Sequence, residues 1–263
     1  MVEQDIWHPL KAFTNARIAL GRTGTAIPLK EVLQFKLAFA YAKDAVYSAL
    51  NSDELIKQLN VFNLPIYKLQ SRALNREMYL QRPDLGRLLN TKSIELLKEN
   101  KSGIKYGIKY DVAIIIADGL SAIAMNKHAF PVVELLINEL KRLNYSIAPI
   151  TIVEQGRVAI GDETGYYLHA QMSVVLIGER PGLTSPDSMG AYLTYNPKQG
   201  LTDERRNCVS NIRPEGLVYE LAAQKIMYLI QESLRLKLSG VELKDNSMVD
   251  LSQNNSAGNG FIE

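Results

Sequence analysis

The sequence predicts an α/β protein in which a helical amino-terminal part precedes a mainly parallel, three-layer sheet domain. Residues 1 to about 100 have a mostly helical character, with Leu29, Leu33 and Leu37 marking one helix face at four-residue steps. From Tyr110 onward, short β-branched runs alternate with amphipathic segments. Strands that alternate with helices are typical of a parallel sheet with right-handed crossovers, so the second part is expected to be Rossmann-like.

Composition limits the possible functions. The chain has 263 residues, 46% of them hydrophobic and 22% charged, and a net charge of +2, which indicates an ordinary globular protein with no preference for nucleic acid. Its three histidines have no metal-ligand spacing, and one cysteine excludes an internal disulfide framework. There is no apolar run long enough for a membrane span and no signal-peptide start. We therefore expect a soluble intracellular protein with no metal and no membrane.

The chain divides into three expected regions. Residues 1–104 form the helical amino-terminal region, in which Pro28 opens a helix. Residues 105–243 form the α/β domain, and the polar, glycine-containing segment 99–109 is the expected junction. Residues 244–263 are polar and are expected to be a disordered tail.

Within the second region the pattern predicts three strands and three helices. The strands are expected at 112–117, 147–153 and 172–177. The helices are expected at 121–143, with a kink at Pro131, at 161–170, and at 214–239, where Gly240 is the stop signal.

The third strand ends in the most informative segment of the chain. The apolar run Met172–Ile177 stops abruptly at Gly178-Glu179-Arg180-Pro181-Gly182. Ligands of open α/β sheets sit at the carboxyl ends of strands, so Glu179 and Arg180 are either ligand contacts or a surface ion pair. The turn-rich segment 184–188 follows directly and is expected to line the same crevice.

Two further candidates have structural alternatives. Asp118 follows a buried strand and precedes a helix, so capping that helix is favoured over a ligand role. Cys208 follows Arg205 and Arg206, whose charges favour a thiolate, but a small packed side chain near a ligand is favoured over a nucleophile. The motifs GxGxxG, GxxxxGK[ST] and GxSxG are absent. The residues alone thus indicate a ligand cleft without catalytic machinery of its own.

Arginine is concentrated in two amino-terminal segments. Arg17 and Arg22 flank a glycine-containing turn, and the segment 70–89 contains four more arginines. Such density is typical of an interface or of an anionic ligand, and a solvated helix face is the alternative.

Several blocks of the sequence resemble one family. ARIALGRTG at 16–24, YLQRPDLGR at 79–87, IADGLSA at 116–122, GERPGL at 178–183, PDSMGAYLTYNP at 186–197 and RNCVSNIRPEGL at 206–217 resemble the small (light) subunit of ethanolamine ammonia-lyase. The resemblance covers about residues 5–243, with the blocks in family order. It implies an adenosylcobalamin-dependent radical enzyme that converts ethanolamine to acetaldehyde and ammonia.

The resemblance also implies partners and site residues. The large subunit is expected to be a TIM barrel that holds the substrate, and residues 1–104 are expected to dock on it. The family's cobalamin contacts fall on Val158 in GRVAIGDE, Glu179 in GERPGL and Cys208 in RNCVSNI. No catalytic residue and no metal ligand is expected in this chain, since the cofactor supplies the difficult chemistry.

Two departures and one alternative qualify these expectations. Many family members have aspartate where Asn75 stands. The DxHxxG motif of some cobalamin proteins is absent, which agrees with the base-on binding that the resemblance implies. The amino terminus is shorter than in family members packaged in bacterial microcompartments, so a cytoplasmic location is expected, with a microcompartment as the alternative. The alternative function is a free-standing cobalamin- or nucleotide-binding module without catalytic activity.

Overall fold

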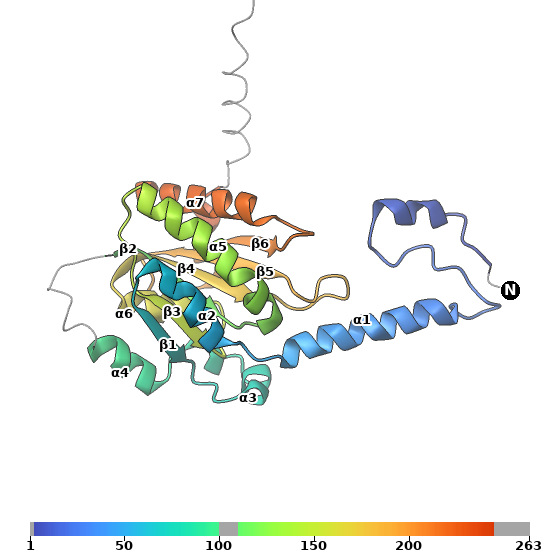
Figure 1. The fold of residues 1–263 in the computed structure, drawn as a ribbon, viewed down its shortest axis with the longest axis horizontal. Coiled ribbons are helices and arrows are strands. Elements are labelled where there is room, and N and C mark those ends of the chain that lie inside the picture. The colour runs from blue at the N-terminus through green and yellow to red at the C-terminus, as the bar shows by residue number, and fades with distance from the viewer. Residues whose placement is uncertain (1–2, 100–109, 245–263) are drawn as a thin grey trace, which may run out of the picture.

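A computed structural model describes residues 3–99 and 110–244 and shows one six-stranded mixed sheet with helices packed on it (Figure 1). The strands are β1 (Ile66–Gln70), β2 (Tyr110–Ala117), β3 (Ile150–Glu154), β4 (Ala170–Gly178), β5 (Met189–Tyr195) and β6 (Arg206–Ile212), in the order β1-β3-β2-β4-β5-β6. The pairs β1–β3, β3–β2 and β2–β4 are parallel, whereas β5 is antiparallel to β4 and β6. The expected mainly parallel α/β sheet is therefore confirmed, with one reversed strand.

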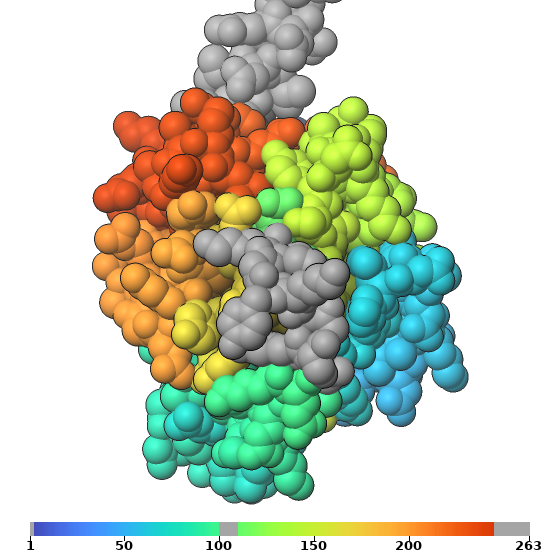
Figure 2. All heavy atoms as spheres, turned by 90° about the vertical axis from the view of Figure 1, so that its left-hand side faces the viewer, coloured from blue at the N-terminus to red at the C-terminus, as the bar shows by residue number. Residues whose placement is uncertain are grey.

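Helices cover both faces of this sheet. The α-helices are α1 (Leu29–Tyr47), α2 (Ser52–Leu59), α3 (Arg76–Gln81), α4 (Thr91–Glu99), α5 (Ala122–Arg142), α6 (Ile160–Tyr167) and α7 (Tyr219–Leu236). Short 3-10 helices occupy His8–Phe13, Asn60–Phe62, Leu85–Arg87, Asp203–Arg205 and Gly240–Glu242. In the end-on view of Figure 2, α5 and α7 (lime and red) lie on the side of the molecule opposite α4 (teal).

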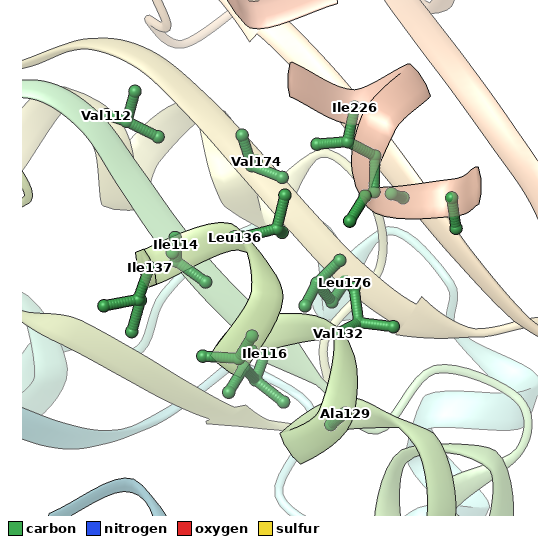
Figure 3. Packing of buried hydrophobic residues seen from close by; sticks show 14 of the residues in the cluster. Val112, Ile114, Ile116, Ala129, Val132, Leu136, Ile137, Val174, Leu176 and Ile226 are labelled. Carbon is green, nitrogen blue, oxygen red and sulfur yellow. The ribbon is translucent and has the colours of Figure 1, made fainter. Parts of the chain in front are cut away.

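The alternation of side chains along β2 explains the three layers. Val112, Ile114 and Ile116 point to one face and belong to the cluster of α2, α5 and α7. Ala113 and Ile115 point to the other face and pack with α4 and α6. Figure 3 shows the first cluster, where side chains of β2 and β4 meet those of α5. A strand that is buried on both faces favours apolar residues at every position, which is why residues 112–117 of β2 form a continuous apolar run.

The helical amino-terminal part is the main correction to the expected fold. Residues 66–70 form β1, an edge strand paired with β3, and α2 and α4 pack on the same sheet as the carboxy-terminal helices. The region before residue 105 is therefore not a separate helical part. The expected junction lies largely at residues 100–109, which fall outside the described residues, as does the tail beyond Lys244.

Other elements differ in number and bounds from the prediction. The prediction of three strands missed β1, β5 and β6, and the last helix begins at Tyr219 and not at residue 214. The helix expected at 161–170 ends at Tyr167, because His169 has a left-handed backbone with φ of 54°. The helix expected at 121–143 is confirmed as α5, with Pro131 inside it.

The first helix has an unusual environment. It begins directly after Pro28, as predicted, and runs away from the sheet (Figure 1). Ala45 is its one buried residue among those that the structure describes. Leu33, Leu37 and Phe39 are more than half exposed, at 55%, 54% and 57%. Residues 3–47 are hereafter called the arm. No helix in the described ranges is both long and apolar enough to cross a membrane.

Two glycines let the carboxyl ends of β2 and β4 approach closely. Gly119 follows β2 with φ of 60°, a backbone conformation that other residues rarely adopt. A Cβ atom on Gly119 would collide with the carbonyl oxygen of Gly178 and with the Ile177 side chain. The amide of Leu120 also donates to the Gly178 carbonyl at 2.9 Å. This contact joins the two loops that follow β2 and β4.

Replacing Gly119 by alanine should therefore destabilise the fold by about 3 kcal/mol or more, through backbone strain and the collision with Gly178. Gly200→Ala is the matched control, because Gly200 also has positive φ (86°) but no atom within 4 Å of the position that an added methyl group would take. Its cost should be about 1 kcal/mol. Urea unfolding of both variants measures the difference, and equal costs would show that the close contact is unimportant.

Candidate functional site

A cleft of about 540 Å³ opens at the carboxyl ends of the parallel strands. The loops after β2, β3 and β4 all contribute to it, as the general rule for open α/β sheets predicts. Its lining consists of Tyr79, Gly119, Leu120, Arg157, Val158, Ile177, Gly178, Glu179, Arg180, Ser185, Ser188, Tyr192, Ser210 and Asn211. Val158 and Glu179 are thus brought together, and the expectation that segment 184–188 lines the same crevice is confirmed.

Asp118 organises the loops beneath this cleft. Its carboxylate accepts hydrogen bonds from the backbone amides of Gln155 and Gly156, both at 2.9 Å, and lies 3.8 Å from the Arg76 guanidinium. The helix that follows is capped by Ser121, whose hydroxyl accepts from Ala124 N, so the expected capping role of Asp118 is wrong. Asp118 instead ties the end of β2 to the loop after β3.

Burial raises the pKa of Asp118 to about 6, although its hydrogen bonds and Arg76 oppose the shift. The side chain is only 5% exposed. The nearby positive charge and the two amide donors therefore compensate only part of the cost of removing a carboxylate from water.

Tyr79 and two arginines form a cluster beside the cleft, which Tyr79 and Arg157 line. The ring of Tyr79 is fully buried, and its centroid lies 4.6 Å from the guanidinium carbon of Arg76 and 4.0 Å from that of Arg157. Its hydroxyl donates to the Gly156 carbonyl at 3.2 Å, and Arg157 donates to the Tyr79 carbonyl at 3.1 Å. Such cation–π contacts connect α3 rigidly to the loop after β3.

Glu179 is held in place by one of its two carboxylate oxygens. Its Oε2 accepts a hydrogen bond from the Ser188 hydroxyl and, at 3.1 Å, one from the backbone N–H of Asn211. Its own backbone amide donates to the Ser188 carbonyl at 2.9 Å. No hydrogen bond within the described ranges reaches Oε1, and Glu179 and Arg180 form no ion pair there. Of the two interpretations of this strand end, the surface ion pair is therefore wrong.

Cys208 does not line the cleft but adjoins it through Tyr192. Tyr192 of β5 lies opposite Cys208 of β6 in the antiparallel register, so the two side chains stand on the same face of the sheet. Tyr192 itself lines the cleft beside Val158 and Glu179. The three residues predicted from sequence therefore lie along one continuous surface, with Tyr192 as the link.

The thiol of Cys208 is not activated by the arginines before it. Arg206 is buried and paired with Asp162 of α6, and Arg205 lies 3.7 Å from Glu242. Desolvation raises the pKa of Cys208, so the expectation of a favoured thiolate is wrong in direction. The side chain is exposed, not packed within the core.

The arginine-rich segment 70–89 separates into different roles. Arg76 is internal, and its Nε donates to the Val46 carbonyl at 2.5 Å. Arg82 is exposed and pairs with Asp84 at 2.7 Å. In the arm, Arg17 reaches the Leu183 carbonyl at 3.4 Å. Asn75 caps α3 by accepting from Met78 N at 2.9 Å, a role that asparagine and aspartate can both fill.

Sequence reasoning missed several residues that line the cleft. Tyr79, Arg157 and Tyr192 stand inside the blocks YLQRPDLGR, GRVAIGDE and PDSMGAYLTYNP, but nothing in those blocks shows that they converge. Their positions depend on which strands are neighbours. In the described part of the chain, no three His, Cys, Asp or Glu side chains gather as metal ligands.

The fold and cleft define an α/β subunit that offers an open, mixed-charge ligand edge and no assembled acid–base or nucleophilic set among its described residues. Comparison with known proteins identifies the particular family. The family described as Ethanolamine ammonia-lyase light chain (EutC) matches residues 4–244, and the chain belongs to it. It is thus a small subunit of ethanolamine ammonia-lyase, and the resemblance deduced from sequence is confirmed.

Individual relatives match this chain over nearly their whole length. The ethanolamine ammonia-lyase small subunit of Pseudomonas fluorescens (strain Pf0-1) is 50% identical over 246 residues, covering 94% of this chain and 89% of the relative. The small subunit of Azotobacter vinelandii is 48% identical over 254 residues, covering 97% and 93%. That of Pseudomonas aeruginosa (strain LESB58) is 49% identical over 243 residues, covering 92% and 88%.

Asp118 should make stability depend on pH. The folded state binds its proton more tightly than the unfolded chain, because the pKa rises from 3.8 to about 6 on folding. Its contribution to the free energy of unfolding is therefore fully present below pH 4 and is lost as the pH rises through 6. Relative to Asp118→Asn, wild-type protein should lose up to about 3 kcal/mol between pH 4 and 7.

Urea unfolding of the two proteins at several pH values measures this change. Asp118→Asn also loses a backbone hydrogen bond, but that cost does not vary with pH. A difference between the two proteins that stays constant from pH 4 to 7 would contradict the raised pKa.

Proposed function

We propose that this chain completes an adenosylcobalamin site at its interface with the large subunit, in an enzyme that converts ethanolamine to acetaldehyde and ammonia. One observation supports the proposal above the others. The cleft at the carboxyl edge of the sheet brings Val158 and Glu179 together, and Tyr192 extends that surface to Cys208. These are the positions at which the family resemblance predicts cobalamin contacts.

The chemistry of the cleft fits a corrinoid. The rim of the corrin ring bears amide groups, whose N–H donors match the carboxylate oxygen Oε1 of Glu179. Val158 and the ring of Tyr192 offer apolar contact beside it. A cleft of about 540 Å³ is within the range for small ligands and takes only an edge of so large a cofactor. The remainder of the cofactor is then left for the large subunit to cover.

In this proposal the residues of this chain bind, orient and exclude water. Adenosylcobalamin supplies the radical chemistry when it is bound. Ser188 and Asn211 hold the Glu179 carboxylate in one orientation, so that its other oxygen is aimed without loss of side-chain entropy on binding. We assign no catalytic residue to this chain and place the substrate-binding groups on the large subunit.

The arm is the part of the amino-terminal region that we propose docks on the large subunit. Apolar side chains are exposed around α1 and also precede it, among them Trp7 (62%) and Phe13 (85%). Large apolar side chains that stay exposed in a contiguous region normally mark an interaction surface. A partner that surrounds the arm would bury these side chains, and the relatives' description as small subunits names the kind of partner.

Arginines are a smaller part of this docking surface than the sequence alone indicates. Arg76 serves the interior of this chain, so it is not available for a partner. Arg82 is exposed, but it already pairs with Asp84. An exposed ion pair contributes little, so apolar contacts of the arm would provide most of the affinity.

The proposal is tested by acetaldehyde release from ethanolamine and adenosylcobalamin, with this chain alone, a cognate large subunit alone, and their mixture. Activity in the mixture alone is the expected result. Co-purification without activity would contradict the proposed cobalamin role. A chain that binds cobalamin by itself and does not associate would favour the free-standing binding module.

Glu179→Gln should weaken cobalamin affinity of the two-subunit complex by about tenfold, since it removes the charge from an acceptor of corrin amides. Equilibrium dialysis with cyanocobalamin measures the affinity. Glu134→Gln is the matched control, because Glu134 is an exposed residue of α5 that does not line the cleft. Equal affinities for the two variants would remove Glu179 from the site.

Leu33→Asp should weaken association with the large subunit at least a hundredfold, because it places a charge among side chains that the complex buries. Leu236→Asp makes the same change at an exposed leucine of α7, outside the arm, and is the control. Analytical ultracentrifugation of each mixture measures association. If both variants assemble like wild type, the arm is not the docking surface.

A further inference from the structure

The cleft has more positive charge than its own residues neutralise. Among the lining residues the charged groups are Arg157, Arg180 and Glu179, so cations outnumber anions. The Glu179 carboxylate already accepts two hydrogen bonds through Oε2 and forms no ion pair with Arg180 in the described structure. A ligand that brings a negative charge would therefore balance the cleft.

The two arginines differ in what holds them. Arg157 stacks on Tyr79 at 4.0 Å and donates to the Tyr79 carbonyl at 3.1 Å, while its Nε is buried without an acceptor in the described chain. Arg180 is exposed at the cleft mouth, and no hydrogen bond or ion pair to it is found within residues 3–99 and 110–244. Arg180 is thus the cation whose donors are available to an incoming anion.

Two serine hydroxyl groups line the same cleft as Arg180. Ser185 and Ser210 line the same cleft from the loop after β4 and from β6. Unlike the Ser188 hydroxyl, which is bound to Glu179, their hydroxyls have no hydrogen-bond partner among the described residues. A guanidinium fork with neighbouring hydroxyl donors is suited to the two non-bridging oxygens of a phosphate diester.

We propose that Arg180, with Ser185 and Ser210, binds the phosphodiester of the cobalamin nucleotide loop. This inference rests on the proposed function. The peripheral amides of a corrinoid are neutral, and its phosphodiester is the one peripheral group with a full negative charge. Glu179 and Arg180 are consecutive residues, so the acceptor for corrin amides and the donor for the phosphodiester would project from the same turn after β4. The orientation of the cofactor would follow from this pair of opposite charges.

Corrinoids that differ in the phosphate test the inference. The affinity of the two-subunit complex is measured by equilibrium dialysis for cyanocobalamin, cobinamide phosphate and cobinamide, all in the cyano form. Arg180→Gln should lower the affinity for cyanocobalamin and for cobinamide phosphate by about tenfold to a hundredfold, the range for a charge-assisted hydrogen bond. Cobinamide affinity should change less than about twofold, since it has no phosphate for Arg180 to bind.

Two further variants make the result specific. Arg180→Lys retains the charge without the fork and should restore part of the lost affinity. Arg142→Gln removes an exposed arginine at the carboxyl end of α5, far along that helix from the cleft, and should change none of the three affinities.

Other outcomes would overturn the inference. Equal weakening of all three corrinoids by Arg180→Gln would indicate that Arg180 supports the subunit interface and not the phosphodiester, and unchanged affinities would remove Arg180 from the site. A wild-type complex that binds none of the three would overturn the proposed function itself. Normal cobinamide binding with a selective loss for phosphate-bearing corrinoids is the result that supports both.

Discussion

The structure of the cleft depends on one buried carboxylate. Asp118 stands at the end of β2, accepts the amides of Gln155 and Gly156 after β3, and faces Arg76 of α3. Because a buried carboxylate is costly without partners, these three segments are held at fixed positions relative to one another. Gly119 then meets Gly178 closely, and the turn that bears Glu179 follows directly. The position of the groups that line the cleft is therefore set from beneath it.

This arrangement fits a subunit to which we assign no catalytic group and which would contribute to a lyase by positioning. Electrostatic positioning requires groups that do not reorganise when the ligand arrives. The Tyr79 ring makes cation–π contacts with two guanidinium groups, and the Glu179 carboxylate accepts hydrogen bonds from Ser188 and Asn211. The residues that these contacts fix lie at the ends of the parallel strands. The side chains that have no partner in the described structure lie at the mouth of the cleft.

The arm has the opposite physical character. Its helix exposes Leu33, Leu37 and Phe39 to solvent, a surface that a protein does not leave uncovered in its working assembly. In the proposed function the sheet domain would face the cofactor with its cleft edge, while the arm would provide apolar area for association. The two halves of the proposed function therefore reside in different parts of the chain, so that assembly and cofactor binding can be altered separately.

By itself, the sequence determined the strands that are buried on both faces, the helices that alternate with them, the family of the chain, and the position of Glu179 at the end of a strand. Continuous apolar runs such as 112–117 have few alternative structures. It did not determine β1, β5 and β6. The edge strands β1 and β6 have exposed positions and mix polar with apolar residues, as in the segment RNCVSNI, and β5 contains a glycine and a threonine although it is largely buried. Nor did it show that Tyr79 meets Arg157, or that Tyr192 joins Cys208 to the cleft. Those contacts link residues distant in sequence, and only the order of the strands in the sheet brings them together.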